Sequence, residues 1–280
     1  MRFLQTILRG IGQVMFQNNS YSGILFLAGI FYNSWSMGLA ALFGTIISTI
    51  TALVLKYPKE DIENGLYGFN GTLTGIALLC FFEVDLLICI ALIIAAVLST
   101  LTMFYLKKII PPFTAPFVLV TWLFTYTLMY FFNYPLITSS ESSLNDIHVL
   151  AASSNSFGQV MFQENVITGL FFLLATLVNN KLMAIYAAYA AILGSLMSWL
   201  MVGNIIEINS GLMGYNAILC AIALVGKKWS DFLWISIAII LSTLLNKGLM
   251  MLGLITLTAP FVLITWGILK LKSNFTPLNA

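Results

Sequence analysis

The sequence predicts an all-α polytopic membrane protein with ten transmembrane helices, organised as two repeats of inverted topology. Three observations lead to this prediction. The chain is very poor in charged residues, three motifs occur twice in the same order, and the apolar runs are interrupted at matching points in the two copies. Each repeat is expected to contain five crossings, a short re-entrant helix before the first crossing, and a broken fifth helix.

The composition of the chain indicates that it is surrounded by lipid. Of its 280 residues, 60% are hydrophobic and 8% are charged, and the mean hydropathy is +0.98. Ordinary soluble domains carry about 25% charged residues, so this chain has too few to cover a surface that faces water. A net charge of +2 without a basic cluster gives no indication of nucleic-acid binding. The three cysteines have no disulfide or metal-ligand spacing.

Three repeated motifs indicate that one structural unit is used twice. The two copies lie 146 residues apart in the first two motifs and 144 apart in the third. The pairs are GQVMFQNN at 12–19 with GQVMFQEN at 158–165, NGLYGFNGTLTGIAL at 64–78 with SGLMGYNAILCAIAL at 210–224, and FTAPFVLVTW at 113–122 with LTAPFVLITW at 257–266. We therefore divide the chain into a first repeat at 1–138, a polar linker loop at 139–156, and a second, inverted repeat at 157–280.

Apolar runs predict the ten crossings, since a helix needs about 20 apolar residues to span a bilayer. They are 22–37, 38–56, 68–83, 85–105 and 113–132 in the first repeat, and 166–180, 182–202, 211–226, 230–246 and 255–270 in the second. Residues 1–17 are too short to span and lack a small-x-small cleavage site, so we expect no signal peptide.

The positions of the basic residues predict the orientation. An odd number of crossings per repeat reverses the second copy relative to the first, which is the arrangement of many transporters. With the N-terminus inside, the outer segments hold only Lys247. The inner segments hold Arg2, Arg9, Lys56, Lys59, Lys107, Lys108, Lys181, Lys227, Lys228, Lys270 and Lys272. This positive-inside bias supports ten crossings with both termini in the cytoplasm.

Paired interruptions of the apolar runs predict a pathway between the repeats. The segments 12–19 and 158–165 are short and polar at both ends, and prolines break the chain before each fifth crossing. Irregular backbone at membrane depth is tolerated where it is buried or lines a cavity. The repeated polar side chains are neutral: Gln13 with Gln159, Gln17 with Gln163, Thr114 with Thr258, and Asn70 with Asn216. The repeated apolar ones are Val14 with Val160, Phe16 with Phe162, Phe69 with Tyr215, and Leu73 with Leu219.

The predicted spans contain almost no ionisable side chains. Such residues mark ion pathways and proton relays, and the only histidine, His148, lies in the linker. No nucleophile with a base partner and no metal cluster is visible, so we expect neither an enzyme nor a metal or other cofactor. The lining favours a small, neutral, polar solute. An ion-coupled carrier, a pore for another amide, ammonia or water, and a scaffold without transport remain as alternatives.

These residues resemble a known family. GQVMFQNN, GLYGFNGTLTGIAL and FTAPF, each with its second copy, are similar to the signature segments of the urea transporter family, over about residues 5–272. The chain looks like a compact member of the bacterial type. The resemblance implies facilitated diffusion of urea down its gradient, and a homotrimer in the cell membrane with one pore per protomer.

The resemblance also implies roles for the repeated residues. Gln13 and Gln159 look like the side chains near the two outer sites of a slot, and Thr114 and Thr258 like its middle constriction. The slot walls would be Val14, Phe16, Phe69, Leu73, Val160, Phe162, Tyr215 and Leu219. This chain departs from the family at two of these positions, because some members have an acidic residue at the place of Gln159 and many have Phe at the place of Tyr215.

Overall fold

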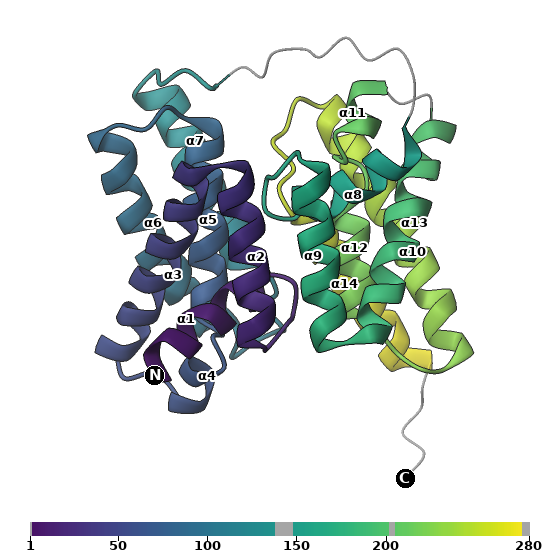
Figure 1. Cartoon of the computed structure of the whole chain (residues 1–280), viewed down its shortest axis with the longest axis horizontal. Helices are drawn as coiled ribbons and strands as arrows, with labels where there is room; N and C mark the ends of the chain where they lie inside the picture. The colour runs from purple at the N-terminus through teal and green to yellow at the C-terminus, as the bar shows by residue number, and fades with distance from the viewer. Residues whose placement is uncertain (1, 138–147, 202–204, 276–280) are drawn as a thin grey trace.

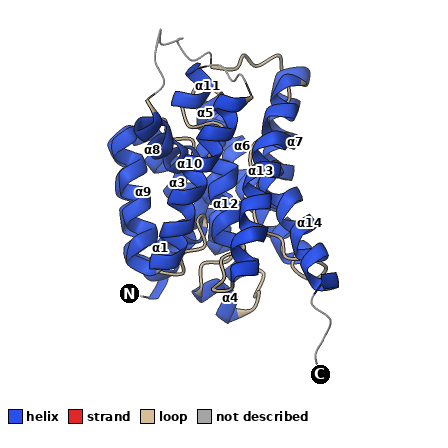
Figure 2. Ribbon diagram, turned by 90° about the vertical axis from the view of Figure 1, so that its right-hand side faces the viewer, coloured by secondary structure: helices blue, strands red, loops and turns tan. Residues whose placement is uncertain are grey.

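The computed structural model describes residues 2–137, 148–201 and 205–275, and within these ranges it contains helices and loops but no strand (Figure 2). The predicted all-α fold is therefore confirmed. The helices before the linker are α1 (Arg2–Gln13), α2 (Ser20–Asn33), α3 (Trp35–Val54), α4 (Lys59–Glu63), α5 (Gly68–Phe81), α6 (Leu86–Leu106) and α7 (Ala115–Phe131). Those after it are α8 (Val149–Gln159), α9 (Val166–Asn179), α10 (Lys181–Leu200), α11 (Ile205–Asn209), α12 (Tyr215–Ala223), α13 (Trp229–Met251) and α14 (Ala259–Phe275).

The two sets of helices follow one plan, so that α1 corresponds to α8 and α7 to α14. The last residue of each repeated eight-residue segment, Asn19 of GQVMFQNN and Asn165 of GQVMFQEN, has the same role. Asn19 accepts hydrogen bonds from the backbone N–H groups of Tyr21 and Ser22, and Asn165 accepts them from Ile167 and Thr168. These side chains are N-caps, which satisfy the free N–H groups at a helix start. The final asparagine of each segment thus caps the start of α2 or α9.

Each of the ten predicted spans contains a helix. By length and composition, α3, α6, α10 and α13 are long and apolar enough to cross a membrane, whereas α5, α7 and α9 are apolar but shorter. The prediction was too long for α12, which occupies only Tyr215–Ala223 of the expected 211–226, because Gly211 makes a turn with φ of +81° before it. It was too short for α13, which continues from the expected end at 246 to Met251.

One further expectation needs correction. The linker was predicted as a loop over 139–156, but α8 begins at Val149, and residues 138–147 lie outside the described ranges. The helix accommodates this polar sequence because Ser156 Oγ donates to the Ala152 carbonyl and Ser154 Oγ to the Val166 carbonyl. The segments 12–19 and 158–165, which were expected to interrupt the apolar runs, begin in the last residues of the short helices α1 and α8 and continue as a turn.

The two halves of the chain lie side by side (Figure 1). They meet where α2 packs against α9 and where α7 contacts α14. Ser22 Oγ of α2 donates to the Ala175 carbonyl of α9 at 2.7 Å, and Thr168 Oγ1 of α9 donates to the Gly29 carbonyl of α2 at 2.9 Å. Small residues and interhelical hydrogen bonds of this kind hold helices together in membranes. The start of α1 and the end of α14 lie at the same end of the molecule (Figures 1 and 2).

Candidate functional site

The site is centred on a contact between the two broken segments. Thr114 Oγ1 and Thr258 Oγ1 lie 2.6 Å apart in one hydrogen bond, and only 1% and 2% of these residues is exposed. Each threonine directly precedes the first residue of its helix, α7 or α14. The residue before each threonine, Phe113 or Leu257, has φ of +47°, which is uncommon outside glycine. The two helices therefore begin face to face in the middle of the protein.

Two tryptophans fasten these broken segments to one another. Trp122 Nε1, on α7, donates to the Ile255 carbonyl at 2.6 Å, and Trp266 Nε1, on α14, donates to the Pro111 carbonyl at 2.7 Å. Each bond crosses from one half to the other. The final tryptophan of the repeated TAPF segment thus holds the loop that precedes the other half's helix.

Two asparagines satisfy the free backbone at the starts of α7 and α14. Asn70 Oδ1 accepts from the Phe117 N–H, and Asn216 Oδ1 accepts from the Phe261 N–H, each at 3.1 Å. Both asparagines are fully buried. A helix that starts inside a membrane protein needs such partners because lipid offers none to its free N–H groups. The sequence had suggested these side chains as pathway lining, and the structure instead assigns their carbonyl oxygens to the backbone.

The GQVMFQ segments form a strained turn. Phe16 and Phe162 both have φ of +60°, a conformation that costs energy for a residue with a side chain and clusters at functional sites. The turn closes with hydrogen bonds from the Gln17 N–H to the Gly12 carbonyl and from the Gln163 N–H to the Gly158 carbonyl, each of 3.0 Å. The turn directs each phenylalanine toward the other half of the chain.

Aromatic pairs then cross the interface at matching places. The rings of Phe16 and Phe261 lie 6.1 Å apart at 81°, and those of Phe162 and Phe117 lie 6.1 Å apart at 76°. Both are edge-to-face contacts, the arrangement that aromatic quadrupoles favour. The phenylalanine of each GQVMFQ segment therefore packs on the TAPF phenylalanine of the opposite half.

The plan shared by the two halves extends to the two buried glutamines, which link the halves. Asn179 Nδ2 donates to Gln17 Oε1 at 2.8 Å, and Asn33 Nδ2 donates to Gln163 Oε1 at 2.9 Å. Each glutamine also turns its own amide back to the backbone, Gln17 to the Met15 carbonyl and Gln163 to that of Met161. In these contacts each glutamine bonds both to its own segment and to the other half.

A cavity of about 340 Å³ has Thr258 in its lining, and its size is within the range of small-molecule sites. Five of the predicted site residues line it: Gln159, Val160, Phe162, Tyr215 and Thr258. The other lining residues are Cys80, Phe81, Ile137, Glu164, Leu212, Ile255, Thr256 and Leu257. Glu164 is exposed at the cavity and is its only acidic residue. The side-chain amide of Gln159 has no hydrogen-bond partner among the described residues.

The remaining predicted residues lie outside this cavity. Val14, Leu73 and Leu219 are fully buried, and Phe69 is 6% exposed. Gln13 is half-buried and donates to the Asn64 carbonyl at 3.0 Å. Phe16 joins a cluster with Phe113 and Phe261, at 6.0 and 6.1 Å between ring centres, next to Thr114. Phe16 and Thr114 thus lie at the interface between the halves, whereas Val14, Leu73 and Leu219 lie in the core.

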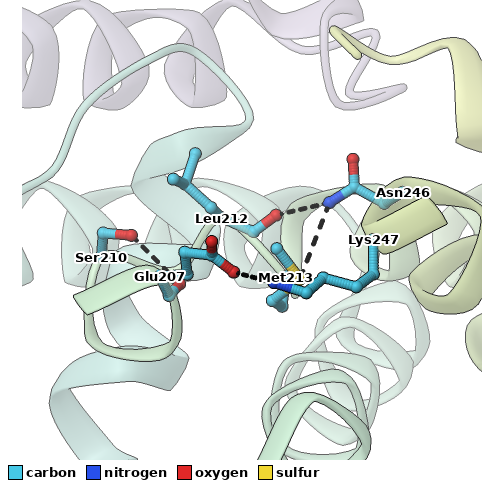
Figure 3. A network of polar contacts seen from close by, with 6 residues as sticks. All are labelled: Glu207, Ser210, Leu212, Met213, Asn246 and Lys247. Carbon is cyan, nitrogen blue, oxygen red and sulfur yellow. Dashed lines mark hydrogen bonds and ion pairs between the residues drawn. The ribbon is translucent and has the colours of Figure 1, made fainter. Parts of the chain in front are cut away.

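Figure 3 shows a polar network beside the cavity that sequence reasoning missed. Lys247 Nζ on α13 pairs with Glu207 Oε2 on α11 at 2.6 Å, and Ser210 Oγ donates to the Glu207 carbonyl. The neighbouring Asn246 donates to the Leu212 carbonyl at 2.8 Å. Lys247 had been assigned to an outer loop. The signal that could have located its partner is Glu207, an acidic residue between the predicted spans 182–202 and 211–226.

Comparison with known proteins agrees with these features. A family profile described as "Urea transporter" matches residues 4–273. A rat (Rattus norvegicus) protein named urea transporter 1 is 32% identical over 249 residues, which cover 81% of this chain and 64% of the relative. A sheep (Ovis aries) protein of the same name is 29% identical over 295 residues, covering 95% of this chain and 76% of the relative.

The match spans less than two thirds of the length of the rat relative. The family match, in contrast, takes in almost all of this chain, including every repeated motif and both broken segments. The resemblance inferred from those motifs is therefore confirmed, and the chain belongs to the urea transporter family.

Proposed function

We propose that this protein passes urea across the cell membrane by channel-like facilitated diffusion, down the urea gradient. The observation that carries the proposal is the Thr114–Thr258 contact, a neutral hydroxyl pair buried where two broken helices meet and reached by a cavity. Within the described ranges, neither threonine hydroxyl has a hydrogen bond to a charged side chain. Relatives that are named urea transporter 1 support urea as the solute.

The proposed architecture is ten crossings in two inverted repeats. It is supported by the exchange of like contacts between the halves: Trp122 with Ile255 and Trp266 with Pro111, and likewise Phe16 with Phe261 and Phe162 with Phe117. An exchange of the same contact in both directions is what a two-fold axis between the copies would produce. With five crossings per repeat, that axis lies in the membrane plane.

The proposed orientation places both termini in the cytoplasm. The first and last described helices reach the same end of the molecule (Figure 1), and eleven of the twelve basic residues belong to segments assigned to that side. The cavity that has Thr258 in its lining then opens outward. We also propose, from the family resemblance, a homotrimer with one pore in each protomer.

Passage of urea would follow from the chemistry of the wall. Taking a polar solute out of water without partners costs a few kcal/mol. Hydroxyl and carbonyl oxygens along one edge of a narrow slot offset this cost, because they accept the N–H groups of urea in place of water. At the centre, urea replaces the bond between Thr114 and Thr258, since each hydroxyl can donate or accept.

The other predicted residues complete the slot. Gln13 and Gln159 would receive urea at the two ends, and the walls would be Val14, Phe16, Phe69, Leu73, Val160, Phe162, Tyr215 and Leu219. For the walls that are buried in this structure, the proposal requires small side-chain movements as the solute passes. Neutral walls without proton-transferring groups allow conduction without an ion gradient.

The test is urea flux into proteoliposomes, measured by stopped-flow light scattering. We expect rates well above those of empty liposomes, unchanged by sodium or proton gradients and constant between pH 6 and 8. Uptake that requires an ion gradient would instead establish a coupled carrier. Competition between labelled urea and ammonia, formamide or water flux separates a urea pore from a pore for those solutes.

A further inference from the structure

The two ends of the proposed slot differ in one hydroxyl group. Phe69 of the first half is replaced by Tyr215 in the second, and Tyr215 lines the cavity. Its hydroxyl donates to the Leu257 carbonyl at 2.6 Å and lies 3.1 Å from Thr256 Oγ1. Leu257 itself lines the cavity and directly precedes the central Thr258.

A second donor reaches the same carbonyl. Asn216 Nδ2 lies 3.3 Å from the Leu257 oxygen and 3.4 Å from Asn246 Oδ1. Asn246 Nδ2 in turn donates to the Leu212 carbonyl (Figure 3), and this bond fixes the orientation of the Asn246 amide. A carbonyl oxygen has two acceptor lone pairs, and both are occupied at Leu257.

The equivalent carbonyl in the first half is that of Phe113. Phe69 has no hydroxyl to offer it, and Asn70 Nδ2 points to Met103 Sδ, at 3.6 Å. Among the described residues, no side chain donates to the Phe113 carbonyl. Both loops have the same φ of +47° at this residue, so the difference arises from the side chains and not from the backbone.

From this difference we infer that Tyr215 is a specificity-determining residue, which withdraws the Leu257 carbonyl from the solute and makes the second-half end of the slot the weaker site for amide N–H groups. The inference rests on the proposed function. Its chemical basis is that a solute such as urea, which carries four N–H donors and one carbonyl, gains affinity from each free acceptor.

The test is Tyr215→Phe, which restores the residue type of the first half and frees one lone pair of the Leu257 carbonyl. Exchange of labelled urea across proteoliposomes, measured over a range of urea concentrations, gives the half-saturation concentration. We expect it to fall by about 2- to 10-fold, the effect of one ordinary neutral hydrogen bond. The reciprocal Phe69→Tyr should raise it by a similar factor.

The matched control is Tyr189→Phe, which also removes a tyrosine hydroxyl contact, the partly buried one with Ser236 Oγ at 2.9 Å between α10 and α13. Neither residue lines the cavity. Its half-saturation concentration should equal that of the unmodified protein. An unchanged value in Tyr215→Phe would overturn the inference, and so would a rise, which would mean that the tyrosine oxygen itself binds urea. If the unmodified protein passes no urea, the proposed function fails instead.

Discussion

The hydroxyl groups of Thr114 and Thr258 are 2.6 Å apart although 144 residues separate them in the chain. Each stands at the start of a helix whose preceding loop is held by a tryptophan of the other half. Each half therefore holds the loop before the other half's threonine, and the two hydroxyls bond to one another when no solute is present. This arrangement makes the two threonines the first target for mutation.

Replacing both central threonines by valine should reduce urea flux. Thr114→Val with Thr258→Val keeps the shape of the side chains but removes both hydroxyls, so that urea finds no partner at the midpoint. Loss of two hydrogen bonds of about 1 kcal/mol each corresponds to a fall of about 10- to 30-fold. Stopped-flow light scattering on proteoliposomes measures the flux.

The control for this experiment is Thr243→Val on α13, where the hydroxyl donates only to the Ile239 carbonyl of its own helix. Its flux should match that of the unmodified protein. If the double variant passes urea at the normal rate while it remains folded, the two threonines have no part in the mechanism.

Enlarging the slot should relax its selectivity. Phe69→Ala removes a large aromatic wall, so bulkier amides such as N-methylurea should gain permeability relative to urea by several-fold. The variant should also lose stability, by about 3–5 kcal/mol for a buried Phe. Phe82→Ala is the matched control, because Phe82 is equally buried but packs against Tyr134. It should lower stability without changing the permeability ratio, and an equal change in both variants would count against a wall role for Phe69.

Gly12, near the end of α1, should not tolerate a side chain, because the turn after this helix passes close to it. A Cβ there would lie 2.3 Å from the Gln17 carbonyl oxygen, which is backbone and cannot move aside. Gly12→Ala should therefore prevent folding or lower the melting temperature strongly. Gly248→Ala on α13 meets no atom within 4 Å, and it should be neutral or stabilising by about 0.5–1 kcal/mol. Tryptophan-fluorescence melting in detergent compares the two, and similar curves would contradict the close approach.

The ion pair between Lys247 and Glu207 should contribute to stability. Its two side chains are 20% and 25% exposed, so Lys247→Met leaves a largely buried carboxylate without its partner and should lower the melting temperature. Adding Glu207→Gln removes the remaining charge and should restore part of the loss, because much of the penalty comes from the unpaired ion. A double variant that is less stable than the single one would show that the charges act independently.

Much of the fold was predictable because lipid imposes simple rules on a chain. Helices occupy all ten predicted positions, since apolar runs in a membrane must form helices to satisfy their backbone. The errors lie at the ends of elements. The serines of 149–156 suggested a loop, yet they form part of α8 because their hydroxyls find carbonyl partners. α13 extends past Lys247 because Glu207 compensates its charge.

The candidate site was predictable in its residue types but not in the task of each side chain. Repetition singled out Asn70, Asn216, Gln17 and Gln163 as well as the threonines. Only the structure shows that the asparagines receive the N–H groups of Phe117 and Phe261, and that the glutamines join the two halves. A buried amide acquires its role from the donors and acceptors that surround it, and these come from distant parts of the chain.

The sequence by itself determined that the protein is helical, that its solvent is lipid, that one unit is used twice, and that it belongs to the urea transporter family. Composition, periodicity and repeated letters are local properties, and they can be read without knowing which segments meet. The tertiary structure alone decided that Thr114 bonds to Thr258, that each phenylalanine of a strained turn packs on the opposite half, and that Tyr215 occupies the Leu257 carbonyl. Such pairings depend on how two helical units approach one another, because short-range contacts between distant residues are fixed only when the whole chain packs.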